Sequence, residues 1–211
     1  GIIEPGHFRF ICNGEQILHL EIQLGYQHRG IENLFLQKKK LIELHTLAEN
    51  ISGDSVIEHT TAFANLWETL CEQKTDEDLH FARTLAAELE RIAIHTGDLS
   101  GMCTDVAYQL GSSVFGRLRT PIINFFQQWC GNRLAKSLIR AGKSNFHFSA
   151  ELGETLKNIL DKFEPDFDEM CNETFGSPTV MGRFEKTGMV TNELGKSIGL
   201  VGMSARMTNI N

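Results

Sequence analysis

The feature that most constrains the fold is a series of long segments in which apolar residues recur at three- and four-residue intervals. This spacing places the apolar side chains of a segment on one face of an α-helix, and such faces must be buried against one another. We therefore expect a mainly α-helical bundle. Its helical segments are expected at about residues 30–48, 54–73, 76–96, 113–129 and 150–172.

The first part of the chain has a different pattern. Phe8 and Phe10 alternate with polar residues, and Asn13-Gly14 then offers the positive φ angles that a type I′ turn requires. Residues 17–24 are rich in Leu and Ile and would form the returning strand. A small antiparallel β-hairpin is therefore predicted ahead of the helices.

Local signals predict where the helices begin and end. Thr75 stands where a capping box would start the third helix. Gly97, Gly101 and Gly111 predict a bend or loop after that helix. Pro165 predicts a kink or an end in the fifth helix, because proline lacks the backbone N–H that a helix interior needs.

The composition is that of an ordinary globular protein. Apolar residues make up 41% of the 211 residues, and no apolar run approaches the ~20 residues that cross a bilayer. The net charge of −7 argues against a general nucleic-acid-binding surface. We expect a hairpin region over residues 1–28 and a helical core over residues 29–211.

The five cysteines are widely scattered, and no two of them have C-x-x-C spacing. Such cysteines are more often buried thiols than metal ligands, so we expect a reducing compartment and no metal bound by this chain. The chain starts at Gly1 without Met and stops at Asn211 without a closing element. We therefore expect it to be a fragment of a longer protein.

Two strings carry more information than composition: "LGYQHRGIENL" at 24–34 and "AELERIAIHTGDLSGMCTD" at 87–105. With "GIIEPGHFRF" at the start and "GNRLAKSLIRAG" at 131–142, they resemble the large subunit of energy-converting, membrane-bound nickel–iron hydrogenases. They also resemble the related subunit of respiratory complex I that helps to form the quinone pocket. The resemblance implies a fold like that of the hydrogenase large subunit, with its C-terminal part missing here.

The resemblance gives a meaning to "ENISGDSVIEH", residues 49–59. Hydrogenases carry E-R-x-C-G-x-C-x-x-x-H at this point, so Ser52 and Ser55 stand where two nickel-ligand cysteines are expected. A thiolate is a soft ligand that ionises near neutral pH when it binds metal, whereas a serine hydroxyl is hard and far less acidic. We expect this chain to lack the nickel–iron centre, as the complex I relative does.

The resemblance also implies residues for proton or quinone chemistry. His7 matches the histidine that contacts the quinone in complex I, and Asp105 matches the carboxylate that orients it. Glu32, in the Arg-Gly-x-Glu element that begins at Arg29, matches the carboxylate that relays protons in hydrogenases. Each has a plainer alternative: a surface histidine, a helix-capping aspartate and an ion pair between Glu32 and Arg29.

Two further positions bear on the quinone hypothesis. Phe63 falls where the complex I subunit has a tyrosine that donates to the quinone, and phenylalanine cannot donate. We interpret Phe63 as a core aromatic residue. His59 matches the histidine that follows the metal ligands, and a hydrogen-bonded core histidine is the alternative.

Several basic residues lie in the segment from residue 117 to residue 143. Arg117, Arg119 and Arg133, with Lys143, match a region that faces the iron–sulfur partner subunit in the family. Arginines on a helix are more often a solvated face, but in a chain of net negative charge an interface remains a reasonable hypothesis.

The function implied is that of a subunit of a membrane-associated oxidoreductase, related to complex I and hydrogenases, that contributes to electron transfer coupled to ion or proton movement. The alternatives are a true complex I quinone-site subunit and, in another class, a non-catalytic scaffold. We expect no cofactor on this chain except a bound quinone, and a 4Fe–4S cluster in a partner. The isolated chain is expected to be inactive.

The implied partners are an iron–sulfur small subunit, other peripheral-arm subunits and membrane antiporter-like subunits, with no nucleic acid. The family also connects the chain with NADH-dependent, NAD-binding complexes. The expected location is the cytoplasmic inner face of the cell membrane, bound peripherally. The isolated fragment is expected to self-associate through its exposed apolar surface.

Overall fold

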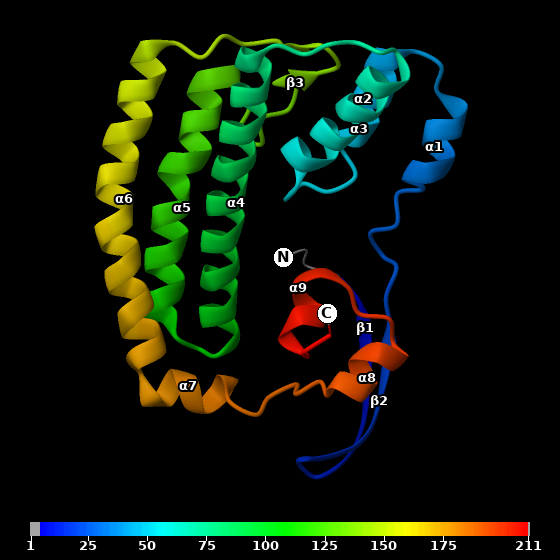
Figure 1. Cartoon of the computed structure of the whole chain (residues 1–211). Helices are drawn as coiled ribbons and strands as arrows, with labels where there is room; N and C mark the ends of the chain where they lie inside the picture. Colours follow the sequence, from blue (N-terminus) through cyan, green and yellow to red (C-terminus); the bar gives the residue numbers. More distant parts are fainter. Residues whose placement is uncertain (1–4, 211) are drawn as a thin grey trace.

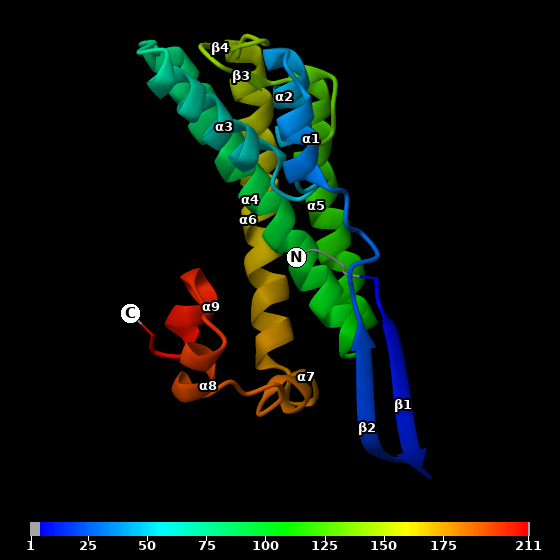
Figure 2. The same cartoon turned by 90° about the vertical axis from the view of Figure 1, so that its right-hand side faces the viewer.

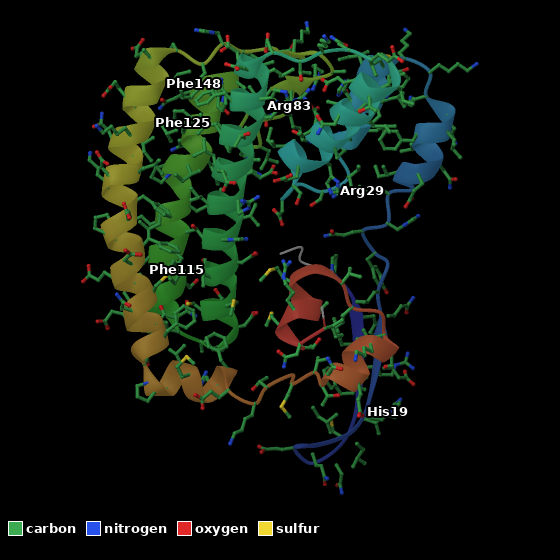
Figure 3. The ribbon with its side chains drawn as sticks, in the orientation of Figure 1. His19, Arg29, Arg83, Phe115, Phe125 and Phe148 are labelled. Carbon is green, nitrogen blue, oxygen red and sulfur yellow. The ribbon has the colours of Figure 1, made fainter. Side chains whose placement is uncertain are left out.

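The computed structural model describes residues 5–210, and its helical core is a layer of three long helices that lie side by side (Figure 1). These are α4 (Glu77–Asp105), α5 (Gln109–Cys130) and α6 (Ala150–Gly176). Their apolar faces meet in one cluster that includes Leu89, Ile122 and Phe125. Figure 3 shows Phe125 and Phe148 near one end of the layer and Phe115 near the other. The predicted helical bundle is confirmed.

Shorter elements surround this layer. On one side, near the start of α4, lie three helices that precede it in the chain (Figure 1). The described elements outside the layer are β1 (His7–Asn13), β2 (Gln16–Gln23), α1 (Ile31–Gln37), α2 (Leu41–Ala48), α3 (Val56–Leu70), β3 (Ile139–Arg140), β4 (Lys143–Ser144), α7 (Pro178–Phe184), α8 (Asn192–Ser197) and α9 (Gly202–Met207). The short β3–β4 pair has no counterpart among the elements predicted from the sequence.

The glycines after residue 96 do not break the helix, which corrects the prediction of a bend. Gly97 and Gly101 lie inside α4, and Gly111 lies in the first turn of α5. A glycine in a helix costs about 1 kcal/mol relative to alanine, and burial of α4 against α5 offsets that cost. Gly111 is needed for close contact, because a Cβ there would lie 2.7 Å from the Cys103 sulfur.

Helix boundaries differ from the sequence prediction in three further places. The segment expected as one helix at 30–48 is divided into α1 and α2. Asp76, rather than Thr75, caps α4: its carboxylate accepts the Leu79 N–H at 2.8 Å. Pro165 lies inside α6 without ending it.

The hairpin is confirmed, with a different turn. Asn13 pairs with Gln16, so the two turn residues are Gly14 and Glu15, and of these only Gly14 has positive φ. A type I′ turn needs positive φ at both, whereas glycine at the first position fits the type II′ arrangement. The hairpin region is predicted to start at residue 1, and residues 1–4 lie outside the described part of the chain.

The hairpin has one apolar face. Phe8 pairs with Ile22 and Phe10 with Leu20, and all residues of both strands are exposed. Figure 2 shows the hairpin projecting to one side of the helical layer, with α8 and α9 on the other. A two-stranded hairpin is marginally stable alone, so this face is suited to contact with another surface.

Candidate functional site

A broad pocket of about 1040 Å³ lies where three parts of the chain meet. These parts are the segment from the end of β2 into the first turn of α1, the loop before α3 and the C-terminal half of α4, with one side chain from α5. The lining residues are Gly25, Gln27, His28, Arg29, Gly30, Ile31, Glu32, Ile51, Ser52, Gly53, Asp54, Ile94, Gly97, Asp98, Gly101, Met102, Asp105 and Arg119.

Five of the residues singled out from the sequence border this pocket: Arg29, Glu32, Ser52, Asp105 and Arg119. The fold brings them together from four separate segments of the chain. Neither Glu32 nor Asp105 makes an ion pair with any residue between 5 and 210, so the alternative of an Arg29–Glu32 ion pair is not formed. The pocket therefore combines carboxylates and guanidinium groups that are available to a ligand or to water.

Three other predicted residues are not among those that line the pocket. His7 is exposed at the start of β1 and makes no hydrogen bond with Asp105 in the described structure. Ser55 precedes α3, and His59 lies one turn into that helix and is half-buried. A role for His7 with Asp105 therefore stays a proposal.

The segment before α1 is held against the loop before α3. The guanidinium of Arg29 donates to the Asn50 carbonyl oxygen at 2.9 Å, and Figure 3 shows Arg29 beside this loop. Gly30 has φ of 61°, a left-handed conformation that costs a glycine little. This turn places Arg29 and Glu32 at the same pocket.

Ser52 and Ser55, which the sequence resemblance matches to thiolate positions of hydrogenases, offer hydroxyl oxygens. Ser52 is only 7% exposed, and its hydroxyl oxygen accepts the Asp54 N–H at 3.3 Å. Ser55 precedes α3 without making a side-chain cap hydrogen bond. Hydroxyl oxygens are hard donors, so they are poorly suited to a nickel–iron centre. In the described part of the chain, no group of three or more His, Cys, Asp or Glu side chains has the arrangement of a metal site.

Arg119 enters the pocket across the backbone of α4. A Cβ at Gly97 would lie 3.2 Å from the Arg119 Cδ and Nε atoms, so glycine provides the space for this side chain. The Nε atom is buried and has no hydrogen-bond partner among the described residues. Arg119 can therefore donate to a group that enters from the pocket.

The other predicted interface arginines lie apart. Arg117 pairs with Asp166 of α6 at 2.7 Å on the exposed surface. Arg133 borders a second, small cavity, and Arg119 borders it as well. Arg117 thus lies in a surface ion pair, Arg119 is half-buried beside the pocket, and Arg133 is exposed.

A buried carboxylate that the sequence did not reveal lies behind the pocket. Glu90 of α4 accepts the backbone N–H groups of Ile57 at 2.8 Å and Glu58 at 3.2 Å. Burial raises the pKa of Glu90 to about 7, and the hydrogen bonds from α3 oppose this shift. No local pattern could have predicted it, because its partners lie more than 30 residues earlier.

A buried polar network supports the other side of the Ser52 loop. Glu49 accepts from Arg140 at 2.6 Å and from the Ser137 N–H at 2.6 Å, and both charged side chains are almost fully buried. Glu68 and Arg83 form a second buried pair, and the Gly142 N–H donates to Glu68 at 2.6 Å. These contacts attach the β3–β4 segment to α2, α3 and α4.

His45 belongs to the same network. It is 2% exposed, and its Nε2 atom accepts the Ala141 N–H at 3.1 Å. Burial, followed by the positive charge of Arg140, lowers the pKa of His45 to about 4. The ring of Phe63 packs edge-on against it, with centroids 4.9 Å apart. Phe63 also contacts Phe35 and Trp67, so it lies in an aromatic cluster.

Comparison with known proteins assigns the chain to a family. The sequence model described as "Respiratory-chain NADH dehydrogenase, 49 Kd subunit" matches residues 105–211, which is half of the chain. The chain belongs to this family. The resemblance seen in the sequence is thereby confirmed.

Individual relatives come from both branches of the superfamily. The D subunit of NADH-quinone oxidoreductase from Clostridium beijerinckii is 25% identical over 201 residues, which cover 95% of this chain and 54% of the relative. Hydrogenase-4 component G of Escherichia coli is 25% identical over 92% of this chain and 35% of the relative. The alpha subunit of the membrane-bound hydrogenase of Pyrococcus furiosus is 21% identical over 100% of this chain and 49% of the relative.

The chain spans about half the length, or less, of these relatives. Alignment with the Clostridium and Pyrococcus relatives extends over nearly the whole chain, so it includes the pocket residues outside the family match. Among the described residues, no helix is both long enough and apolar enough to cross a membrane.

Proposed function

We propose that this 49 kDa-subunit family member is a subunit of a membrane-associated oxidoreductase related to complex I and to membrane-bound hydrogenases. It has no nickel–iron centre of its own and contributes to electron transfer coupled to ion or proton movement. The observation that carries the proposal is the replacement of both ligand thiols, at Ser52 and Ser55, beside a pocket that retains Arg29 and Glu32. The chain thus retains the neighbouring pocket residues but not the two ligand cysteines.

The pocket has the groups that proton transfer requires. Glu32 and Asp105 border it from two different helices, and Arg29 and Arg119 add positive charge. A polar pocket of this size is filled by water or by a ligand, since its carboxylates and hydroxyl need hydrogen-bond partners. We propose that Glu32 and Asp105 exchange protons with that water, while electrons pass through the 4Fe–4S cluster of a partner subunit.

Quinone binding is the second candidate function. The buried Nε of Arg119, which lacks a partner among the described residues, could donate to a quinone carbonyl oxygen, and Arg29 could help to hold the headgroup. Two observations weaken this candidate. His7 does not border the pocket, and Phe63 packs in an aromatic cluster elsewhere. Proton transfer by Glu32 and Asp105 needs neither residue.

The partners follow from the relatives, which are named as subunits or components of larger enzymes. We propose an iron–sulfur small subunit, other peripheral-arm subunits and membrane antiporter-like subunits as partners of this chain. A position at the cytoplasmic inner face of the membrane, and a connection with an NAD-binding subunit, belong to the same proposal. The exposed apolar face of the β1–β2 hairpin supports contact with a partner.

The test is turnover of the intact membrane complex that carries Glu32→Gln or Asp105→Asn. General acid–base groups contribute on the order of 100-fold or more, so each variant should slow turnover by about that factor. Asp161→Asn, an exposed residue of α6, is the matched control and should leave turnover unchanged. Normal turnover of both pocket variants in a fully assembled complex would contradict the proposal and favour a non-catalytic scaffold.

A further inference from the structure

Glu90 replaces a cap that α3 does not provide for itself. The residue before α3, Ser55, makes no side-chain hydrogen bond to the helix, and the Glu90 carboxylate accepts from Ile57 and Glu58 instead. The side chain is only 8% exposed. The two oxygens accept one N–H each, so a neutral amide, which has one acceptor oxygen, could replace only one of these hydrogen bonds.

Glu90 is one of the residues that border a cavity of about 20 Å³, which is large enough for one water molecule. Gly53, Arg119 and Arg133 border the same cavity. A buried water needs two to four polar partners. Glu90 and the two arginines can provide three, including the buried Arg119 Nε that has no partner in the described structure.

This cavity adjoins the broad pocket. Gly53, Ile94 and Arg119 border both spaces, so one layer of residues separates them. Arg119 in particular faces both sides of this layer. The water-sized cavity thus lies between Glu90 and the residues that it shares with the pocket.

Several charges influence the carboxyl group. Glu58 of α3 faces it and favours the protonated form, while the N–H groups of α3 favour the ionised form. Arg119 of α5 and Arg133 of the following loop face the cavity. On its own helix, Arg91 is paired with Glu58 and Glu88 at the surface. Burial is the largest influence, and with a pKa of about 7 both forms are populated near neutral pH.

We propose that Glu90 is a proton-binding residue that exchanges protons with the pocket through the water-sized cavity. In this step one proton moves from pocket water to a carboxylate oxygen of Glu90, and no electron is transferred. The protonated oxygen then carries an O–H, which weakens its acceptance of a backbone N–H of α3. The inference deepens the proposed proton-handling function of the pocket and rests on it.

The experiment is an infrared pH titration of the isolated 211-residue chain in light and heavy water. A protonated carboxyl band should disappear with a midpoint at about pH 7 and should be missing in Glu90→Gln, which keeps an acceptor oxygen for the cap. Glu58→Gln, which changes only an exposed neighbour, should lower the midpoint. Absence of a titrating band near neutral pH, or a band that survives Glu90→Gln, would overturn the proposal. So would an unchanged midpoint in Glu58→Gln.

The route is tested by filling the cavity. Ala93→Val adds carbon atoms to a residue that lines it, so deuterium exchange of the Glu90 proton should slow at least several-fold. Ala62→Val, on the exposed side of α3, is the control and should leave exchange unchanged. Equal exchange rates in wild type and Ala93→Val would overturn the route. Because no partner subunit is needed, failure here is distinguishable from failure of the turnover test in the complex.

Discussion

Glu49 and Ser52 are three residues apart, yet they belong to two polar regions with opposite properties. In the buried network around Glu49, each carboxylate faces an arginine at hydrogen-bond distance. In the pocket beside Ser52, Glu32 and Asp105 form no ion pair within the described residues. The first region holds loops together, and the second leaves charged groups open to water. The loop that contains Ser52 is thus held on one side by the buried network and borders the pocket on the other.

The largest expected effect comes from breaking the buried network. Glu49→Ala leaves Arg140 without its carboxylate in a buried site, and such a change costs about 3–5 kcal/mol. Chemical denaturation should show this loss. Arg91→Ala, which removes two exposed ion pairs, is the control and should cost less than ~1 kcal/mol. Equal losses in the two variants would contradict the assignment of the network as the stabilising region.

The dependence of stability on pH distinguishes His45, in the buried network, from Glu90, which lies behind the pocket. Folded His45 binds a proton only below about pH 4, whereas unfolded histidine does so below about 6.5, so His45 lowers stability as the pH falls through this window. Glu90 acts in the opposite direction. Unfolded glutamate ionises above about 4.5 and folded Glu90 only near 7, so stability falls as the pH rises.

The two contributions, each about 3 kcal/mol, therefore oppose each other in the wild type between about pH 4.5 and 6.5. Denaturation of single variants should separate them. In Glu90→Gln the stability should rise with pH over this range, and in His45→Gln it should fall. The same slope in both variants would show that at least one of these two residues titrates normally.

Much of the fold could be predicted from the sequence, because helix faces and strand alternation are local patterns. Gly97 of α4 could not be interpreted in this way, since its contact with Arg119 of α5 is not a local property. Resemblance identified Glu32, Ser52 and Asp105, which the structure brings to one pocket. It could not reveal Glu90, because a carboxylate that caps a helix 33 residues away leaves no periodic signal.

A smaller effect should follow from Gly97→Ala in the pocket wall. The added Cβ lies 3.2 Å from Arg119 and must displace it, while alanine favours the helix by about 1 kcal/mol. Stability should therefore stay equal or rise, and the nitrogen resonance of Arg119 Nε should shift. In Gly101→Ala, where a Cβ meets nothing within 4 Å, only the stability should rise. An unshifted Arg119 resonance in Gly97→Ala would remove the reason given for glycine at this position.

The smallest effect on stability is expected in the hairpin. Phe8→Ser with Phe10→Ser changes two exposed side chains, so the free energy of unfolding should change by less than ~0.5 kcal/mol. Self-association of the isolated chain, measured by sedimentation, should decrease. Arg9→Ala on the polar face is the control and should alter neither quantity. Undiminished self-association would show that the apolar face is not the contact surface.

The central claim is that this chain is related to nickel–iron subunits but binds no nickel. Its nickel content is the most direct test of that claim. The measurement is elemental analysis of the full-length protein purified from cells supplied with nickel. Because Ser52 and Ser55 provide hard oxygen donors in place of thiolates, we expect far less than stoichiometric nickel. A content of about one nickel per chain, retained after dialysis against a chelator, would contradict this expectation.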